Sequence, residues 1–299
     1  MIDLTTAENA LKDVYLGVIA NQLNEKTDPV WRRIRKSSND VYGKEIRVLP
    51  SWIGRYKEKC PVLSSELKTI YGKVEISDKA IRCSINSSGA FVNLLNSEME
   101  NLISSTQKRL RDALYNEDKA PEYLPEKLKE NYQPLVITGF KEIFSNSESL
   151  YGLSRNEYHE LNPRVEHIKG FDFYKVQEII DNYCENATFI VCNAKFRREY
   201  MESQRFSSIE DLGGGFKALM FNNMIPIIVN YTIPENEIYI IDINDFTFHQ
   251  LCDWQWISDT NNRVLKQKQG LPMYECDLVK YGDLICDNPS KQIKIIINE

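Results

Sequence analysis

Apolar side chains recur at helical spacing in two stretches of the N-terminal third of the chain. Residues 5–24 place apolar positions on one face, and Thr5 with Glu8 forms a capping box, so we expect a short amphipathic helix. Residues 87–116 carry a longer apolar stripe that is broken only near Thr106. At 1.5 Å per residue this helix would be about 45 Å long, well beyond the usual three or four turns. The pattern predicts a helix that serves as a spine.

Apolar and polar residues alternate in two runs before the long helix. Residues 44–49 and 67–76 read as strands, and a polar, basic link with Pro50 and Pro61 joins them, so we expect them to pair as an extended hairpin. Because an isolated hairpin is marginal in water, we expect this one to lie against something else.

Helical and strand patterns alternate in the second half of the chain. Helices are expected at about 172–184 and 194–203, with a glycine turn at Gly213–Gly215 before the next strand. The strands expected here are 188–192, 225–230, 238–243, 246–251, 254–257, 273–278 and 293–297. The sequence therefore predicts a mixed α+β protein.

Charge is distributed unevenly along the chain. The formal net charge of −6 excludes a broadly basic nucleic-acid binder. Residues 32–59 nevertheless carry nine Lys/Arg against three Asp/Glu, a local +6, so the remainder sums to −12. A basic segment on an acidic body favours docking against another copy of the chain. The alternative is a solvated charged loop.

The sequence carries no targeting or membrane signal. The opening residues lack a basic n-region and an unbroken apolar run, and no stretch reaches the roughly 18 apolar residues of a membrane helix. Seven cysteines form no CxxC pair. These features predict reduced thiols in a cytoplasmic setting.

Candidate catalytic motifs are weak. The three histidines have no metal-ligand spacing, and Gly213–Gly215 lacks the Lys-Ser/Thr of a phosphate loop, which favours a positive-φ turn. Asp242 and Asp245 resemble a metal-nucleotide motif, although acidic residues are also common in turns. The sequence predicts no enzyme and no cofactor, with a metal-dependent α/β enzyme at Asp242 and Asp245 as an alternative.

The order of these segments resembles a known protein family. The opening MIDLTTAENALKDVYLGVIANQLN, the segment YGKVEISDKAIRCSINSSGAFVNLLNSEME and the later LGGGFKALMFNNMIPIIVNYTIPENEIYIIDINDF are similar to the major capsid protein of tailed double-stranded DNA bacteriophages. FIVCNAKFRREY and the closing DLVKYGDLICDNPSKQIKII fit the same pattern. The resemblance covers nearly the whole chain.

The resemblance implies the Hong Kong-type phage major capsid fold. Its parts would be an N-terminal arm, an extended β-hairpin loop, a peripheral domain with a long spine helix, and an axial domain around the five- or six-fold axis. Their expected ranges are 1–36 for the arm, 37–76 for the loop, 77–125 and 246–299 for the peripheral domain, and 126–245 for the axial domain.

The resemblance also implies function and partners. We expect a structural protein that self-assembles into hexamers and pentamers of an icosahedral shell enclosing double-stranded DNA, assembled in the host bacterial cytoplasm and resident in the virion. Expected partners are further copies of the chain, a separately encoded scaffolding protein, a portal protein and packaged DNA through weak, non-specific contacts, with no membrane. Alternatives are a cargo-holding nanocompartment on the same fold and a repurposed prophage protein. The lysine-rich SWIGRYKEK and the post-spine LYNEDKAPEY depart from the family pattern at places where subunits meet.

The predicted subunit interface lies in the arm and the loop tip. Its residues are Trp31, Arg32, Arg33, Arg35, Trp52, Arg55, Lys57 and Lys59. For the two tryptophans, packing within their own subunit is the alternative.

Overall fold

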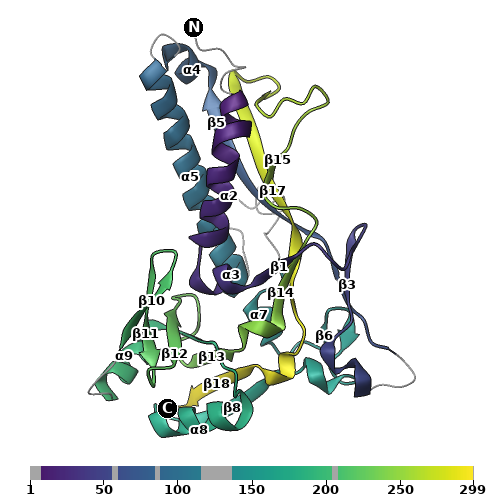
Figure 1. Cartoon of the computed structure of the whole chain (residues 1–299), viewed down its shortest axis with the longest axis vertical. Coiled ribbons are helices and arrows are strands. Elements are labelled where there is room, and N and C mark those ends of the chain that lie inside the picture. Colours follow the sequence, from purple (N-terminus) through teal and green to yellow (C-terminus); the bar gives the residue numbers. More distant parts are fainter. Residues whose placement is uncertain (1–7, 56–59, 85–87, 116–136, 204–207, 299) are drawn as a thin grey trace.

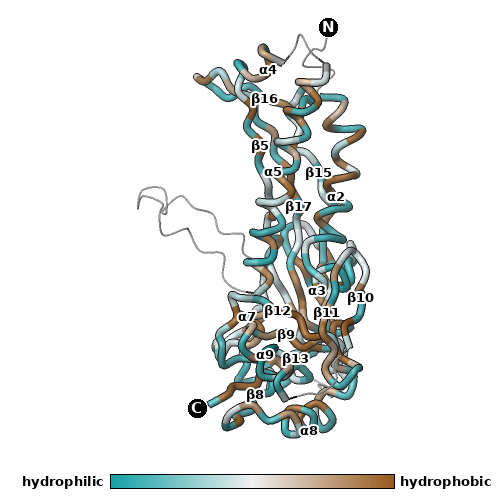
Figure 2. The backbone as a smooth tube through the Cα atoms, turned by 90° about the vertical axis from the view of Figure 1, so that its left-hand side faces the viewer, coloured by the Kyte–Doolittle hydropathy of each residue, from teal (hydrophilic) through white to brown (hydrophobic). Residues whose placement is uncertain are grey.

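The protein is built on two separate β-sheets that lie at different heights of an elongated body (Figure 1). This computed structural model describes residues 8–55, 60–84, 88–115, 137–203 and 208–298. The upper part is narrow and helical, and the lower part widens into the second sheet. Figure 2, turned by 90°, shows the same narrow body from the side.

A long helix and a long strand form the spine. Helix α5 (Ser88–Tyr115) confirms the predicted spine helix, and it packs on β5 (Lys68–Ser77), which pairs with β17 (Met273–Cys286) in antiparallel register. Gly72 of β5 allows this close packing, because a Cβ there would overlap Thr106 and Leu102 of α5. The polar break in the helical stripe at Thr106 is thus the point where the helix meets the strand.

Short strands complete the first sheet. β1 (Arg35–Ser37) pairs in parallel with β14 (Phe246–Gln250), which pairs with β17, and β15 (Gln255–Trp256) and β16 (Lys266–Gln267) also lie against β17. The remaining elements of this upper part are η1 (Leu11–Tyr15), α2 (Leu16–Glu25), α3 (Pro29–Arg33) and α4 (Asp78–Ser84). Helix α2 runs beside α5, so the predicted N-terminal helix is confirmed over its described residues (Figure 1).

The second sheet has seven strands in the order β10-β11-β12-β9-β13-β18-β8. Its strands are β8 (Arg164–Lys169), β9 (Phe189–Cys192), β10 (Ile209–Gly213), β11 (Phe216–Phe221), β12 (Ile225–Val229), β13 (Glu237–Ile241) and β18 (Ile293–Asn298). Helices α8 (Phe173–Tyr183) and α9 (Ala194–Ser203) confirm the predicted helices, and α8 begins at its N-cap Asp172. Apolar positions run through these strands near the bottom of Figure 2.

Two features of the second sheet were not predicted from sequence. The strands expected at 225–230 and 238–243 are present as β12 and β13, but they are not neighbours, because β9 lies between them and pairs with both. Residues 209–213, for which no strand was expected, form β10, which pairs with β11 across the glycine turn. The exposed, acidic sequence of β10 gives no alternation from which a strand could be predicted.

The extended loop is a hairpin formed by different strands from those predicted. β3 (Glu45–Val48) pairs with β2 (Val41–Tyr42) and with β4 (Leu63–Glu66), whereas β5 turns away to join β17. The loop also contains η2 (Ser51–Arg55) and projects from the side of the body (Figure 1). The apolar face of β5 covers α5, which is why this strand belongs to the spine.

The chain passes between the two sheets twice in its C-terminal part. Between β13 and β14 it runs through η4 (Ile243–Asp245), and between β17 and β18 through η5 (Pro289–Lys291). The last strand, β18, lies in the seven-stranded sheet between β13 and β8, rather than with β14 and β17, with which the sequence grouped it. Ile293 and Ile295 are buried in the core of that second sheet, which explains the crossing.

A small group of elements covers the junction between the sheets. They are α7 (Phe140–Ile143), β6 (Ser149–Leu150), β7 (Leu153–Ser154) and η3 (His159–Leu161). Within the described ranges no helix is long and apolar enough to cross a membrane.

Candidate functional site

The N-terminal arm is packed against its own spine. Trp31 of α3 is fully buried, and its ring meets Phe248 edge-on with centroids 4.9 Å apart. At the other end of the arm, the Trp256 indole N–H donates to the Leu11 carbonyl at 2.9 Å. Both ends of the described arm therefore contact the first sheet, at β14 and at β15.

Asp28 fixes the turn between α2 and α3. Its Oδ1 accepts hydrogen bonds from the amides of Val30 and Trp31, at 2.8 and 3.2 Å, and from the Tyr115 hydroxyl at 2.9 Å. Burial raises the pKa of this carboxyl, while the hydrogen bonds oppose the shift. Asp28 thus caps α3 and ties the arm to Tyr115 at the end of α5.

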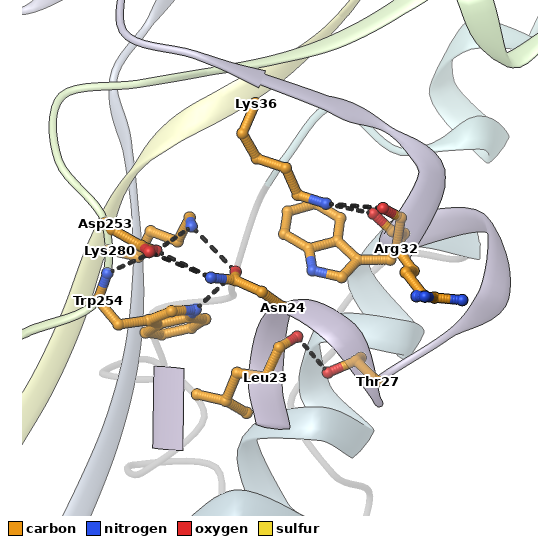
Figure 3. A network of polar contacts seen from close by, with 9 residues as sticks. Leu23, Asn24, Thr27, Arg32, Lys36, Asp253, Trp254 and Lys280 are labelled. Carbon is orange, nitrogen blue, oxygen red and sulfur yellow. Dashed lines mark hydrogen bonds and ion pairs between the residues drawn. The ribbon is translucent and has the colours of Figure 1, made fainter. Parts of the chain in front are cut away.

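A polar network, here named the arm clasp, joins the arm to the first sheet through Asn24, Asp253 and Lys280 (Figure 3). Lys280 is 0% exposed, and its Nζ lies 2.7 Å from Asp253 Oδ1 and 3.2 Å from Asn24 Oδ1. The Asn24 amide donates to both Asp253 oxygens at 3.2 Å, and the Trp254 indole donates to Asn24 at 3.2 Å. The Asn24 side chain of the arm thus forms hydrogen bonds with Lys280, Asp253 and Trp254.

A second contact links the arm to the glycine turn of the lower sheet. Arg32 pairs with Glu25 at 2.8 Å and donates from Nη1 to the Leu212 carbonyl at 2.7 Å. Gly213 and Gly214 have positive φ values, and a Cβ at Gly213 would overlap the Arg32 guanidinium. The glycines therefore serve a turn, as expected, and also admit the arm.

The other predicted basic residues of the arm take different environments. Arg33 is exposed, with its guanidinium 5.4 Å from the Phe189 ring centroid, and Arg35 is exposed on β1. Lys36 folds back over the Trp31 ring at 4.9 Å and donates to the Trp31 carbonyl at 2.6 Å. Burial, reinforced by nearby Lys280, lowers the pKa of Lys36 to about 8.

The extended loop is tied to the body where Ser51 and Trp52 contact Asp287. The Ser51 amide donates to the Asp287 carboxylate at 2.8 Å, and the indole of Trp52, which is 5% exposed, donates to the Asp287 carbonyl at 2.9 Å. Both predicted interface tryptophans thus pack within their own chain, which was the alternative. Arg55 ends η2, while Lys57 and Lys59 lie outside the described residues. The interface itself stays a prediction.

Gln292 connects the two chain crossings between the sheets. Its side-chain oxygen accepts from the Asp242 amide at 2.9 Å, and its Nε2 donates to Asp245 Oδ2 at 2.8 Å. Asp242 itself accepts from the Asn244 amide at 3.0 Å. Among the described residues no group of three or more His, Cys, Asp or Glu side chains is arranged to hold a metal ion. The Asp242 and Asp245 carboxylates serve the crossing.

Comparison with known proteins gives matches in structure alone. No protein-family model and no curated protein matches the sequence. The capsid of cyanophage A-1(L) matches with a TM-score of 0.64 and 9% identity, covering 92% of this chain and 93% of that one. The capsid of an empty GTA particle matches at 0.55 and 12% identity, covering 91% and 90%. The chain has the phage capsid fold.

The capsid fold is shared with proteins other than phage heads. The holo-SrpI encapsulin complex of Synechococcus elongatus matches with a TM-score of 0.54 and 12% identity, covering 93% of this chain and 94% of that one. The comparisons confirm the α+β capsid fold and the resemblance read from the sequence. At identities of 9 to 12%, these matches show the fold of the chain.

The residues that hold the arm were not found from sequence. No role was predicted from sequence for Lys280, Asp253 or Asn24. The signal available was a lysine inside the apolar run DLVKYGDLIC, where burial needs a partner. Asp253 lies 27 residues and Asn24 lies 256 residues from Lys280 along the chain, so sequence spacing does not reveal that they are its partners.

Proposed function

We propose that this chain is a major capsid protein, which forms hexamers and pentamers of an icosahedral shell around double-stranded DNA. The carrying observation is the capsid fold over more than nine-tenths of the chain, with an exposed basic loop projecting from a rigid spine. Ring contacts between the lower, axial sheets would be heterologous and would close by rotation. The loop would lie over a neighbouring subunit, where its basic residues meet an acidic body.

The loop offers surface suited to such a contact. Tyr42 and Leu49 are 62% and 64% exposed, and Lys44 and Arg47 are exposed beside them. Apolar side chains with basic neighbours are typical of a surface that another chain covers. A separately encoded scaffolding protein and a portal protein are part of the proposal, as is weak contact with packaged DNA.

Sedimentation velocity of the purified chain, with negative-stain microscopy of the fastest fraction, tests the proposal. We expect discrete pentamers and hexamers or closed particles tens of nanometres across. A chain that stays monomeric at all concentrations, also after addition of the scaffolding protein encoded beside it, would contradict a shell function and favour a repurposed protein.

A cargo-holding nanocompartment is the second candidate, favoured by the similarity to the encapsulin complex. Particles isolated from the native host distinguish the two. DNA protected from nuclease inside the particle supports the capsid, whereas a co-purifying enclosed protein without DNA supports the compartment.

A further inference from the structure

A cleft of about 580 Å3 lies where the arm, the spine helix and the axial sheet meet. Its walls are the lower end of α5, the junction of α2 with α3, and strands β11 and β12. Four basic side chains from three elements line it: Lys108 and Arg111 of α5, Arg197 of α9 and Lys217 of β11.

The basic side chains of the cleft exceed its acidic ones. The lining carboxylates are Asp28 and Asp112, and Asp28 is buried with its Oδ1 already accepting three hydrogen bonds. Within the described ranges none of the four cations forms a salt bridge. The cleft is therefore a local positive site on a chain whose net charge is −6.

The arrangement of the cations suits an extended anion. Lys108 and Arg111 are three residues apart on one helix face, so their side chains project to the same side. Arg197 and Lys217 come from the lower part of the molecule and complete the lining. A guanidinium binds a phosphate group with two parallel hydrogen bonds, and an ammonium binds it as a point charge.

The charge pattern favours nucleic acid over an acidic polypeptide as the anion, because a duplex presents regularly spaced phosphates that guanidinium groups bind with two parallel hydrogen bonds. Phe216 and Tyr231 also line the cleft, and Tyr231 is 77% exposed. The faces of paired bases are already stacked within a duplex, so the contribution expected of Tyr231 is a hydrogen bond from its hydroxyl to a phosphate oxygen. These rings were not grouped with any basic residue by sequence, because the elements that carry them are far apart along the chain.

We propose that this cleft binds the phosphodiester backbone of nucleic acid. The proposal rests on the proposed enclosure of DNA and names the surface of the subunit that would contact it. Binding would be independent of sequence, because the cations meet the phosphate backbone that every nucleotide shares.

Fluorescence anisotropy with a fluorescein-labelled DNA duplex, measured at several salt concentrations, tests the cleft. If all four cations neutralise phosphates, log Kobs falls against log salt with a slope of about −3.6. We expect K108Q/R111Q to reduce the slope to about −1.8 and to weaken binding about tenfold or more at low salt. R197Q/K217Q, on other elements, is expected to do the same.

The matched control is K79Q/K175Q, which removes two exposed positive charges from α4 and α8 outside the cleft. An equal loss of binding in this control would overturn the proposal, since it would indicate diffuse attraction. Wild-type affinity in both cleft variants would also overturn it. So would competition by polyglutamate at the same charge concentration as DNA, which would indicate an acidic protein segment as the occupant.

Sedimentation velocity on the same variants separates this proposal from the shell function. Cleft variants that assemble like the wild type but lose DNA binding support both proposals. If the wild type does not assemble even with the scaffolding protein added, and the cleft variants still lose binding relative to the control, the shell function fails and the cleft stands.

Discussion

The Lys280 side chain, including its ammonium group, is fully buried. Burial lowers its pKa, and the hydrogen bond to Asp253 opposes that shift. Asp253 itself is 52% exposed on its side chain, so the two partners of this ion pair depend on each other unequally. A buried charge without a partner costs several kcal/mol, whereas an exposed one returns to water at little cost.

This asymmetry gives a prediction for the arm clasp. Asp253→Ala leaves the buried ammonium with the Asn24 hydrogen bond and the Phe248 and Trp254 rings but no counter-charge, and should lower the free energy of unfolding by about 2–3 kcal/mol. Lys280→Met leaves Asp253 and Asn24, whose polar groups can reach water, and should lower the free energy of unfolding by less. Urea denaturation measures the free energy of unfolding of both variants. Equal losses would contradict the unequal burial of Lys280 and Asp253.

Asp245 lies at the crossing between the sheets with a perturbed carboxyl. Burial, followed by the neighbouring Asp242 and Asp287 carboxylates, raises its pKa to about 6 against the opposing pull of Lys291. A raised carboxyl pKa means that the folded state holds a proton the unfolded state has released. The contribution to stability is present below about pH 4 and is lost as pH rises through 6.

Asp245→Asn should therefore stabilise the fold by about 1 kcal/mol at pH 7, because the amide keeps an acceptor for Gln292 and carries no charge. The gain should vanish near pH 4. Thermal unfolding at both pH values measures it. A variant less stable than the wild type at pH 7 would mean that the charge itself holds the crossing.

At the scale of elements, the glycine turn between β10 and β11 is where the seven-stranded sheet meets the arm. Gly213 and Gly215 both have positive φ, but only at Gly213 would a Cβ meet Arg32, and nothing lies within 4 Å of a Cβ at Gly215. Comparing alanine substitutions at these two glycines therefore separates the free-energy cost of backbone strain from the cost of displacing the arm.

Gly213→Ala should destabilise the fold by about 1–3 kcal/mol more than Gly215→Ala, since overlap with Arg32 adds to a shared strain. Hydrogen exchange in α2 and α3 should rise in the first variant alone. Similar losses in both variants, with unchanged exchange in the arm, would show that the contact with Arg32 contributes nothing.

Elements with strong periodicity were predictable from sequence, and their partners were not. The stripe of α5 fixes its length because one face is buried along its whole course. β17 was read as a short strand near residues 273–278, since Lys280, Gly282 and Asp283 interrupt its apolar run. Those residues are buried and satisfied by distant groups, a tertiary effect that a local pattern does not carry.

The same reason explains the outcome for the candidate site. Tryptophans in a basic segment suggested an exposed interface, yet Trp31 and Trp52 pack inside because β14 and Asp287 supply partners from the far end of the chain. The charge imbalance was visible from composition, but which cations line a common cleft depends on the fold.

At the scale of the whole molecule, the basic segment 32–59, which spans the end of the arm and the start of the extended loop, and the acidic remainder give assembly a charge dependence. Lys44 is exposed at the turn between β2 and β3, where a change of charge leaves the packed core untouched. Attraction between exposed charges is screened at physiological salt, so assembly should also weaken as salt rises.

Lys44→Glu should raise the concentration required for half-assembly about tenfold, or about 1.4 kcal/mol, while the unfolding midpoint stays unchanged. Lys44→Arg keeps the charge and serves as the control. Analytical ultracentrifugation across a concentration series measures the shift. Unchanged assembly of Lys44→Glu would show that the turn between β2 and β3 is not part of the interface.

The paired crossings at η4 and η5 also have a mechanical consequence. Two strands of backbone run side by side between the upper and lower sheets, and Gln292 ties one to the other. Two parallel tethers resist torsion about the long axis, because twisting must shear the Gln292 bonds, but they bend together across their common plane. Twisting the spine against the seven-stranded sheet would therefore have to break the Gln292 hydrogen bonds, whereas tilting across the plane of the two crossings would leave them intact.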